Sequence, residues 1–255
     1  MNANKPDHLQ GAGTPLSQWQ ASPLLQQVPT VSLQELVPQG HRLVVVAPHP
    51  DDEVLGCGGL LAMMTGREAD LLVVSVTDGD ASHPGSSTWP AARLRDERPQ
   101  ESERALACLK LDVERLRWHR LGLPDTRVEQ FEDQLCSHLV DLLRPGDRVL
   151  TTWRHDAHGD HEAVGRACAN AVALANARLL EMPVWTWHWA SPQDPRLPWQ
   201  RARKLLLDDV TLARKRLAVN AHTSQLHEDA GTGAPAVLTA TTLERLLQPF
   251  EMIFV

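Results

Sequence analysis

Short runs of β-branched and other apolar residues recur along the chain, and segments with helical periodicity separate them. The clearest runs cover residues 42–48 (RLVVVAP), 70–77 (DLLVVSVT) and 147–153 (DRVLTTW), and a fourth covers 113–121 (VERLRWHRL). Continuous apolar runs of this length are typical of strands buried on both faces. The alternation predicts an α/β fold: a Rossmann-like, mostly parallel sheet with helices on both faces in a single domain.

The segments between these runs supply the predicted helices, at residues 53–66, 99–111, 128–145, 161–177 and 210–222. Residues 183–190 (PVWTWHWA) alternate tryptophan with other residues, which predicts a further strand whose tryptophans belong to the core rather than to a sugar-stacking surface. Residues 203–209 predict another strand, and residues 250–255 (FEMIFV) an edge strand or a tail.

The first 40 residues differ from the rest in composition. They are rich in Gln and Pro and weakly periodic, although Ser32 to Glu35 (SLQE) fits a capping box at the start of a short helix. We therefore expect residues 1–40 to form an N-terminal extension and residues 41–255 to form one domain.

The overall charge and the cysteines exclude some classes of protein. The net charge of −7 argues against a general nucleic-acid binder, which would carry a basic excess. The four cysteines form no CxxC pair and indicate buried thiols in a reducing compartment. The polar start lacks the apolar core of a signal peptide, and no apolar run approaches the length of a membrane span. We expect a cytoplasmic protein without a membrane span, and the oligomeric state is not predicted.

Polar side chains follow each of the four predicted strands. His49 follows the first strand, Asp78 the second, Asp125 the third, and the segment 155–161 the fourth. Because the carboxyl ends of parallel strands meet at one edge of a sheet, these groups should lie near one another. This shared edge is where we expect a functional site.

The turn HPDDE (49–53) has two interpretations. In the first, Asp51 or Asp52 caps a helix and the neighbouring acids complement its positive end. In the second, His49 and Asp52 converge on a metal ion, because imidazole and carboxylate are ligands that zinc prefers. Only the second explains His49. A third ligand has an obvious source in residues 153–165 (WRHDAHGDHEAVG), which are rich in histidine and aspartate, although that segment also fits a solvated, acid-capped helix start.

Taken together, APHPDDEVLGCGG (47–59) and DAHGDHEAVG (156–165) resemble the PIG-L (LmbE-like) family of zinc-dependent N-acetylglucosaminyl deacetylases. Weaker matches are TDGDASH (77–83), RDERPQESERALACL (95–109), LGLPD (121–125) and KRLAVNAHTSQ (215–225). The resemblance covers residues 41 to about 226, so the extension and the C-terminal segment lie outside it.

The resemblance implies roles for individual residues. It implies metal ligation by His49, Asp52 and His161, a mixed site that leaves room for water. It implies that Asp51 is the general base; the alternative is that Asp51 only accepts a hydrogen bond and orients a neighbour. It also implies that a protonated His158 stabilises the oxyanion.

The roles of the remaining polar residues are less specific. The resemblance implies that Arg98 and Asp125 contact sugar hydroxyls, with Arg95 as a rival for Arg98. Glu53 is interpreted as a helix-start and hydrogen-bonding residue, and His222 as a structural one. Two assignments stay open: which of Asp156 and Asp160 orients the imidazoles, and whether Asp78 and Asp80 bind substrate or end a strand.

The predicted function is a metal-dependent hydrolase that removes the N-acetyl group from an N-acetylglucosamine-type sugar or sugar conjugate, with water on the metal as nucleophile. The alternatives are an amidase that cleaves a larger amide of a sugar–thiol conjugate, and a non-catalytic sugar- or metal-binding module. Zn²⁺ is the expected cofactor, and the same donors accept Fe²⁺. The run GCGG (56–59) lacks GxGxxG spacing and follows an acidic turn, which excludes a dinucleotide site. The expected partner is a small amino-sugar, and neither nucleic acid nor a membrane is expected.

Overall fold

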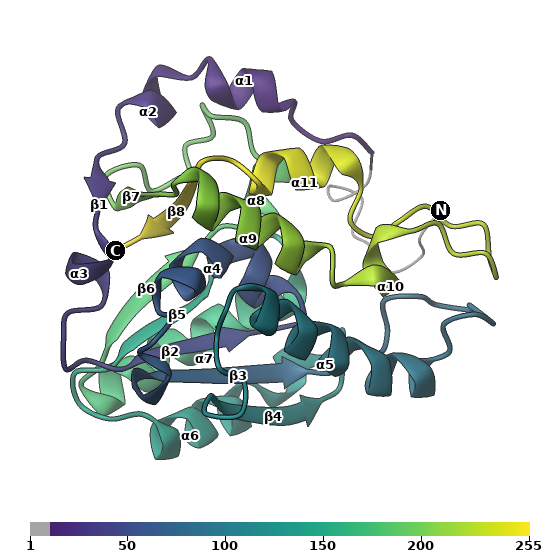
Figure 1. The fold of residues 1–255 in the computed structure, drawn as a ribbon, viewed down its shortest axis with the longest axis horizontal. Coiled ribbons are helices and arrows are strands. Elements are labelled where there is room, and N and C mark those ends of the chain that lie inside the picture. Colours follow the sequence, from purple (N-terminus) through teal and green to yellow (C-terminus); the bar gives the residue numbers. More distant parts are fainter. Residues whose placement is uncertain (1–10) are drawn as a thin grey trace.

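A computed structural model describes residues 11–255, and these residues form a central eight-stranded sheet between two layers of helices (Figure 1). The strand order is β1-β7-β8-β6-β5-β2-β3-β4. The strands are β1 (Thr30–Val31), β2 (Leu43–Ala47), β3 (Leu71–Thr77), β4 (Arg117–Leu123), β5 (Arg148–Thr152), β6 (Arg178–Met182), β7 (Ala202–Leu206) and β8 (Phe250–Phe254). Strands β2 to β6 are mutually parallel, and β8 is antiparallel to both of its neighbours. The predicted mostly parallel α/β fold is confirmed.

The helices fall into two layers. The longer ones are α4 (Asp52–Met63), α5 (Ala91–Cys108), α6 (Glu132–Leu142), α7 (Gly159–Ala175) and α9 (Asp209–Val219), and the shorter ones are α1 (Leu16–Gln20), α2 (Pro23–Gln26), α3 (Leu33–Leu36), α8 (Thr186–Trp189), α10 (Thr223–Leu226) and α11 (Ala240–Leu246). Helices α4, α5 and α9 pack together on one face of the sheet, and α6 and α7 pack together on the other. Single turns of 3₁₀ helix at Glu68–Asp70 and Val128–Phe131 lead into β3 and α6.

Strand β2 shows why the sequence folds this way. Each residue from Leu43 to Ala47 is completely buried. Successive side chains of a strand point to opposite faces. Leu43 and Val45 therefore join the core beneath α4 and α5, while Val44 and Val46 join the core beneath α6 and α7. A strand between two helical layers needs apolar residues at every position, which is the pattern read in the sequence.

The topology places the carboxyl end of β2 at the point where the strand order reverses. The chain proceeds from β2 through β3 to β4 on one side, and then returns to β5 and β6 on the other side of β2. The helices that follow β2 and β5 leave the sheet in a way that opens a crevice between the two strand ends, where open α/β sheets bind ligands. The turn at His49 follows β2 and the histidine-rich segment follows β5.

The prediction of a strand at 183–190 is wrong. The parallel strand after α7 is β6, which begins five residues earlier than the predicted strand. The tryptophan-rich segment instead forms the short helix α8. The alternation of tryptophans has the period of a strand, but backbone hydrogen bonds to Asp156 bend the chain into a helical turn at this point. A tertiary contact thus overrides the local pattern.

The position of one strand and the starts of two other elements also differ from prediction. β8 is an internal strand between β6 and β7 rather than an edge strand or tail. β4 begins at Arg117, because residues 112–116 form a turn in which Asp112 accepts backbone hydrogen bonds from Arg115 and Leu116. α5 begins at Ala91 rather than Pro99, since residues 91–98 contain good helix formers and the proline is tolerated inside the helix.

Residues 11–40 run along the sheet edge and the adjoining helices. The capping box at Ser32 and Glu35 is present at the start of α3, as predicted. β1 extends the sheet through β7, and Trp19 of α1 is completely buried against Trp187, with ring centroids 4.8 Å apart. Within residues 11–255, no helix combines the length and apolar character that crossing a membrane requires.

Candidate functional site

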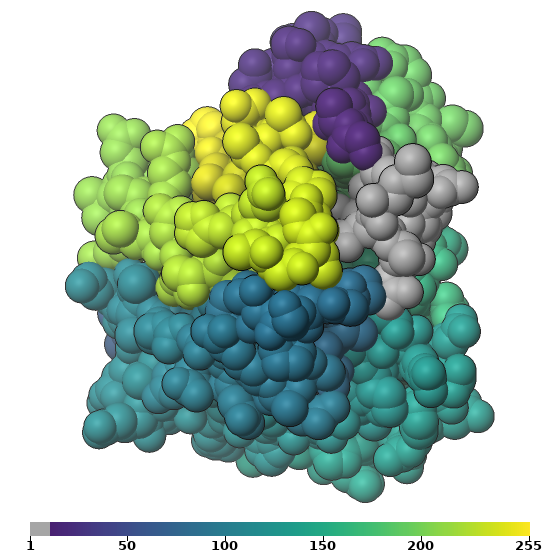
Figure 2. Space-filling model, turned by 90° about the vertical axis from the view of Figure 1, so that its right-hand side faces the viewer, coloured from purple at the N-terminus to yellow at the C-terminus, as the bar shows by residue number. Residues whose placement is uncertain are grey.

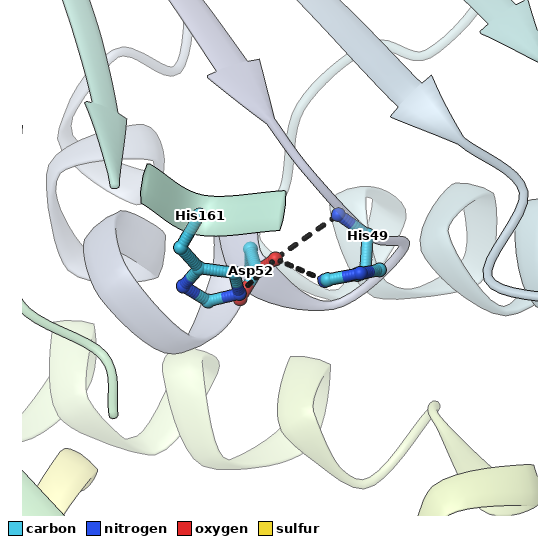
Figure 3. Close-up of side chains that lie close together, drawn as sticks. All are labelled: His49, Asp52 and His161. Carbon is cyan, nitrogen blue, oxygen red and sulfur yellow. Dashed lines mark hydrogen bonds and ion pairs between the residues drawn. The ribbon is translucent and has the colours of Figure 1, made fainter. Parts of the chain in front are cut away.

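Three side chains from two distant turns converge at the carboxyl ends of β2 and β5 (Figure 3). His49 lies between β2 and α4, Asp52 is the first residue of α4, and His161 lies in the first turn of α7. The Asp52 Oδ2 atom is 3.1 Å from His49 Nδ1 and 3.2 Å from His161 Nε2. The three ligand atoms lie within 4.8 Å of one another, so one ion can contact them all.

The chemistry of this group fits a divalent cation. His161 Nε2 is buried and has no hydrogen-bond partner within residues 11–255, although it lies beside the Asp52 carboxylate. An imidazole nitrogen in this position is available as a ligand, and two imidazoles with one carboxylate form a typical catalytic zinc set. The group His49, Asp52 and His161 therefore suits a metal, and its donors accept zinc.

Two further carboxylates surround His49. Its Nε2 atom lies 3.1 Å from Asp160 Oδ2 and 3.2 Å from Asp125 Oδ1. Burial by itself lowers the pKa of His49, but the bonds to Asp125, Asp160 and Asp52 outweigh it and hold that pKa well above its usual value. The environment thus favours positive charge, which either a proton or a metal ion supplies.

Asp156 orients the second imidazole. Its Oδ2 atom lies 2.8 Å from His161 Nδ1, which leaves His161 Nε2 turned toward Asp52. The same carboxylate accepts backbone hydrogen bonds from Val184, Trp185 and Thr186, and a further bond from the Thr186 hydroxyl. A carboxylate behind a metal-binding imidazole fixes both its tautomer and its orientation.

Asp51 occupies an unusual backbone conformation at the start of α4. Its φ is 150°, a region that costs a residue with a Cβ atom about 1–3 kcal/mol. Its side chain makes no capping hydrogen bond, so the helix-cap interpretation is wrong for this residue. Glu53 instead accepts a hydrogen bond from the Asp51 backbone N–H at 3.1 Å, in line with its predicted role. Burial raises the pKa of Asp51 to about 7, although Arg98 opposes the increase.

Arg98 lies beneath the site rather than in solvent. Only 2% of the residue is exposed, and its guanidinium donates to Asp51 Oδ2 at 3.0 Å and to the Pro50 and Gly79 carbonyls. Gly79 has a φ of +65°, and a Cβ atom there would overlap the guanidinium. Arg95, the alternative to Arg98 in the sequence analysis, is exposed and pairs with Asp80. Of the two arginines, Arg98 reaches the site, where it holds Asp51.

His158 lies beside both candidate ligand imidazoles, with ring centroids 4.9 Å from His49 and 4.7 Å from His161. Burial, followed by the charges of His161 and His49, lowers the pKa of His158 to about 3. This environment opposes the protonated His158 that the resemblance implies. A neutral imidazole still donates one N–H hydrogen bond.

A small pocket of about 90 Å³ opens over these groups. Its lining includes His49, Asp51, Arg98, Asp125 and His158. A larger cleft of about 630 Å³ adjoins it and shares Asp125 and Thr126. Asp78 and Asp80 line this cleft and pair with Arg120 and Arg95. Segments near residues 80–95 and 225–240 meet on this face (Figure 2).

Gln225 is a pocket residue that sequence reasoning missed. Its Nε2 atom donates to Ser224 Oγ at 2.8 Å, and the Ser224 hydroxyl in turn donates to the buried Glu101 carboxylate at 2.6 Å. This chain fixes the amide orientation and leaves Gln225 Oε1 buried without a hydrogen-bond partner in the described part of the chain. The only signal in the sequence is the resemblance of the segment KRLAVNAHTSQ to the family, which gives Gln225 itself no role.

The other outcomes concern the tryptophans and His222. Trp185 and Trp187 both belong to the hydrophobic core, as predicted, and Trp185 lines the pocket as well. His222 is completely buried, and neither of its ring nitrogens has a hydrogen-bond partner among residues 11–255. It does not line the pocket, in line with a structural role.

Comparison with known proteins finds relatives that are similar to this chain in sequence. A probable N-acetyl-α-D-glucosaminyl L-malate deacetylase 2 of Bacillus subtilis is 28% identical over 135 residues, which cover 51% of this chain and 60% of the relative. A 1D-myo-inositol 2-acetamido-2-deoxy-α-D-glucopyranoside deacetylase of Mycobacterium sp. (strain KMS) is 30% identical over 179 residues, covering 61% of this chain and 56% of the relative. The chain thus spans less than two thirds of the length of these curated relatives.

Solved structures share the fold. The N,N′-diacetylchitobiose deacetylase of Pyrococcus horikoshii superposes with a TM-score of 0.57 at 18% identity, covering 76% of this chain and 73% of that one. The family model described as PIG-L, GlcNAc-PI de-N-acetylase, matches residues 44–172, which contain both turns of the site. This match spans just over half of the chain, and the chain therefore belongs to the PIG-L family.

Proposed function

We propose that this protein is a zinc-dependent deacetylase that removes the N-acetyl group from an N-acetylglucosamine-type sugar or sugar conjugate. The observation that carries the proposal is the convergence of His49, Asp52 and His161 next to a pocket that His49, Asp52 and the buried acid Asp51 line. The relatives support the substrate class, because the curated names of the two described above share an N-acetylated glucosamine unit and differ in its substituent.

His49, Asp52 and His161 would hold the ion. A bound Zn²⁺ supplies a Lewis acid that polarises an amide carbonyl and makes water a better nucleophile near neutral pH. Asp156 and Asp160 support this role, since each lies at hydrogen-bond distance from the ring nitrogen of one of the two imidazoles.

Asp51 is the proposed general base. Its carboxyl lines the pocket and its pKa is raised to about 7, so it takes a proton from the attacking water and returns it to the leaving amine. Arg98 keeps this carboxyl in place through the 3.0 Å ion pair. The strained backbone at Asp51 turns the side chain out of the helix-capping position and toward the pocket.

His158 and Asp125 complete the proposed machinery. His158 also lines the pocket and donates an N–H to the developing oxyanion as a neutral imidazole. Asp125 belongs to both the small pocket and the larger cleft, where a sugar hydroxyl is within reach of its carboxylate. The small pocket suits the acetamido group, and the cleft has room for the sugar and its substituent.

The test is acetate release by the zinc-loaded protein from a panel of N-acetylglucosaminyl malate, N-acetylglucosaminyl inositol, N,N′-diacetylchitobiose and a larger sugar–thiol amide. We expect acetate from at least one N-acetyl sugar and no cleavage of the larger amide. Asp51→Asn should lower kcat by about 100-fold or more, because general-base catalysis is lost. Zinc affinity should be retained, since Asp51 is outside the ligand group.

Two results would contradict the proposal. Cleavage of the larger amide without acetate release would make the protein an amidase. Absence of any amide hydrolysis, with zinc and sugar still bound, would make it a binding module. Full turnover by Asp51→Asn would leave the deacetylase intact but remove Asp51 as its base.

A further inference from the structure

The segment from Ala12 to Trp19 lies outside the family match and holds the short helix α8 by its backbone. The Thr14 N–H donates to the His188 carbonyl at 2.8 Å, and the Trp19 indole N–H donates to the Trp187 carbonyl at 3.0 Å. Two of the last carbonyls of α8, which have no partner within the helix, thus receive hydrogen bonds from this segment.

Arg245 of α11 closes the same contact from the other side. The residue is 2% exposed, and its Nη1 atom donates to the Ala12 and Thr14 carbonyls at 2.8 and 3.0 Å. Its Nη2 atom lies 2.8 Å from His188 Nδ1. Figure 2 shows the N-terminal segment, in purple, against the C-terminal helix, in yellow. A buried guanidinium that satisfies backbone carbonyls in this way fixes both the N-terminal segment and α8.

The contact leaves no space for a side chain at Gly13. Its φ is +65°, and a Cβ atom there would lie 2.6 Å from His188 Nδ1 and 2.7 Å from the His188 carbonyl oxygen. Gly11 provides the comparison, because its φ is +77° and a Cβ atom there would meet nothing within 4 Å. The two glycines share the left-handed backbone and differ only in contact with α8.

The start of α8 is part of the site. Val184, Trp185 and Thr186 donate their backbone N–H groups to Asp156, the carboxylate that orients His161. Trp185 also lines the small pocket. A shift of α8 would therefore move a wall of the pocket and disturb the carboxylate behind a proposed metal ligand.

We propose that residues 12–19 act as a clamp whose contacts with α8 position Trp185 and, through Asp156, the His161 imidazole. Gly13, Trp19 and Arg245 are positioning residues, since none of them lines the pocket. The inference rests on the proposed function for its effect on catalysis, but its effects on α8 and on zinc binding do not depend on which substrate is cleaved.

The test compares Gly13→Ala with Gly11→Ala in the full chain. Both variants carry the same cost of an alanine in left-handed backbone, and only the first displaces His188. We expect Gly13→Ala to weaken zinc binding about tenfold, the lower end of the loss seen when a group behind a ligand is disturbed. Zinc affinity is measured by competition with a chromogenic chelator, and KM for an N-acetyl sugar should rise in parallel. Gly11→Ala should match the wild type.

Hydrogen exchange of the α8 amides gives a readout independent of metal and substrate. Gly13→Ala should speed exchange at residues 184–189, and Gly11→Ala should not. Trp19→Phe keeps an aromatic ring but removes the donor to the Trp187 carbonyl, and it should shift zinc affinity in the same direction if Gly13→Ala fails to fold.

Equal zinc affinity and equal α8 exchange in the clamp variants and in Gly11→Ala would overturn the proposal. Faster exchange with unchanged zinc affinity and unchanged KM would overturn it as well, because the contact would then be structural only. If the wild type binds zinc but cleaves no N-acetyl sugar, the proposed function fails and the zinc titration still decides whether the clamp exists.

Discussion

Three adjacent acidic residues at the start of α4 behave differently because their surroundings differ. Burial would raise the pKa of Asp52, but His161 and His49 hold it well below its usual value. Burial raises the pKa of Asp51 to about 7 and also raises that of Glu53, which bonds to the backbone. Three like residues thus become a candidate ligand, a candidate base and a structural acceptor.

Gln225 provides a prediction at this scale. Replacing Gln225 by Met removes the unpartnered Oε1 acceptor while keeping an unbranched side chain of similar length. We expect kcat/KM to fall about tenfold through KM, the worth of one neutral hydrogen bond. Steady-state kinetics would show it. A sugar analogue that lacks the hydroxyl expected to donate to Gln225 Oε1 should lose the same factor in the wild type and nothing more in the variant. An unchanged KM of the variant for the full substrate would exclude this hydrogen bond.

The burial of His222 makes the free energy of unfolding depend on pH. Burial, followed by the charges of Arg98 and Arg104, lowers the pKa of His222 to about 3 in the folded protein, against about 6.5 when unfolded. The unfolded chain therefore binds more protons between these values, and stability falls as the pH drops below about 6.5.

His222→Gln should remove this dependence. Between about pH 7.5 and pH 5 the wild type should lose about 2 kcal/mol more of its unfolding free energy than the variant does. Urea denaturation at the two pH values measures the difference. His138→Gln serves as the matched control because His138 is exposed. Identical pH dependence in wild type and His222→Gln would show that His222 contributes nothing to it.

Among the elements, α4 depends on the last strand of the chain. The helix is interrupted at Cys57, whose φ and ψ are −143° and 25°. The amide groups freed by this break, those of Gly59 and Leu60, donate to the Glu251 carboxylate of β8 at 2.6 and 2.8 Å. Lys215 of α9 completes the contact with a 2.7 Å ion pair, and both charged residues are almost fully buried.

Lys215→Met should therefore destabilise the protein strongly. It leaves the Glu251 carboxylate buried without its cation, which typically costs about 3–5 kcal/mol. Chemical denaturation measures the change in unfolding free energy. Arg104→Met, which breaks the exposed pair with Glu97, is the control and should cost less than about 1 kcal/mol. Similar losses in the two variants would contradict the importance of burial at Lys215.

For the whole molecule, the site concentrates negative charge. Asp52, Asp125, Asp156 and Asp160 all lie within hydrogen-bond distance of His49 or His161. A bound cation would relieve the repulsion among these carboxylates, and a ligand that binds only the folded state stabilises it.

Zinc should thus raise the stability of the metal-free protein by about 4 kcal/mol when its free concentration is about a thousand times its Kd. Thermal unfolding with and without a chelator would measure the shift in Tm. His161→Gln should abolish the shift, whereas His155→Gln should keep it, because His155 is an exposed histidine of the same loop. An equal shift in both variants would place the zinc elsewhere.

The sequence predicted the fold class and the edge of the sheet that carries the site because both depend on local patterns. Continuous apolar runs identify buried strands such as β2, and parallel strands bring their carboxyl ends together. Local patterns failed for α8, where contacts to Asp156 from far along the chain decided the conformation. The segment KRLAVNAHTSQ resembles the family, but no local pattern within it marked Gln225 as a pocket residue. The cytoplasmic location and the boundary at residue 40 stay predictions.

The sequence by itself determined which residue types stand at the ends of β2 and β5, since hydrophobic periodicity and the turns after each strand are properties of adjacent residues. Tertiary structure decided which of those residues meet, how each carboxyl titrates, and how residues 12–19 contact α8. These depend on burial and on distances between segments up to 233 residues apart, such as Arg245 and Ala12, and no local pattern encodes them.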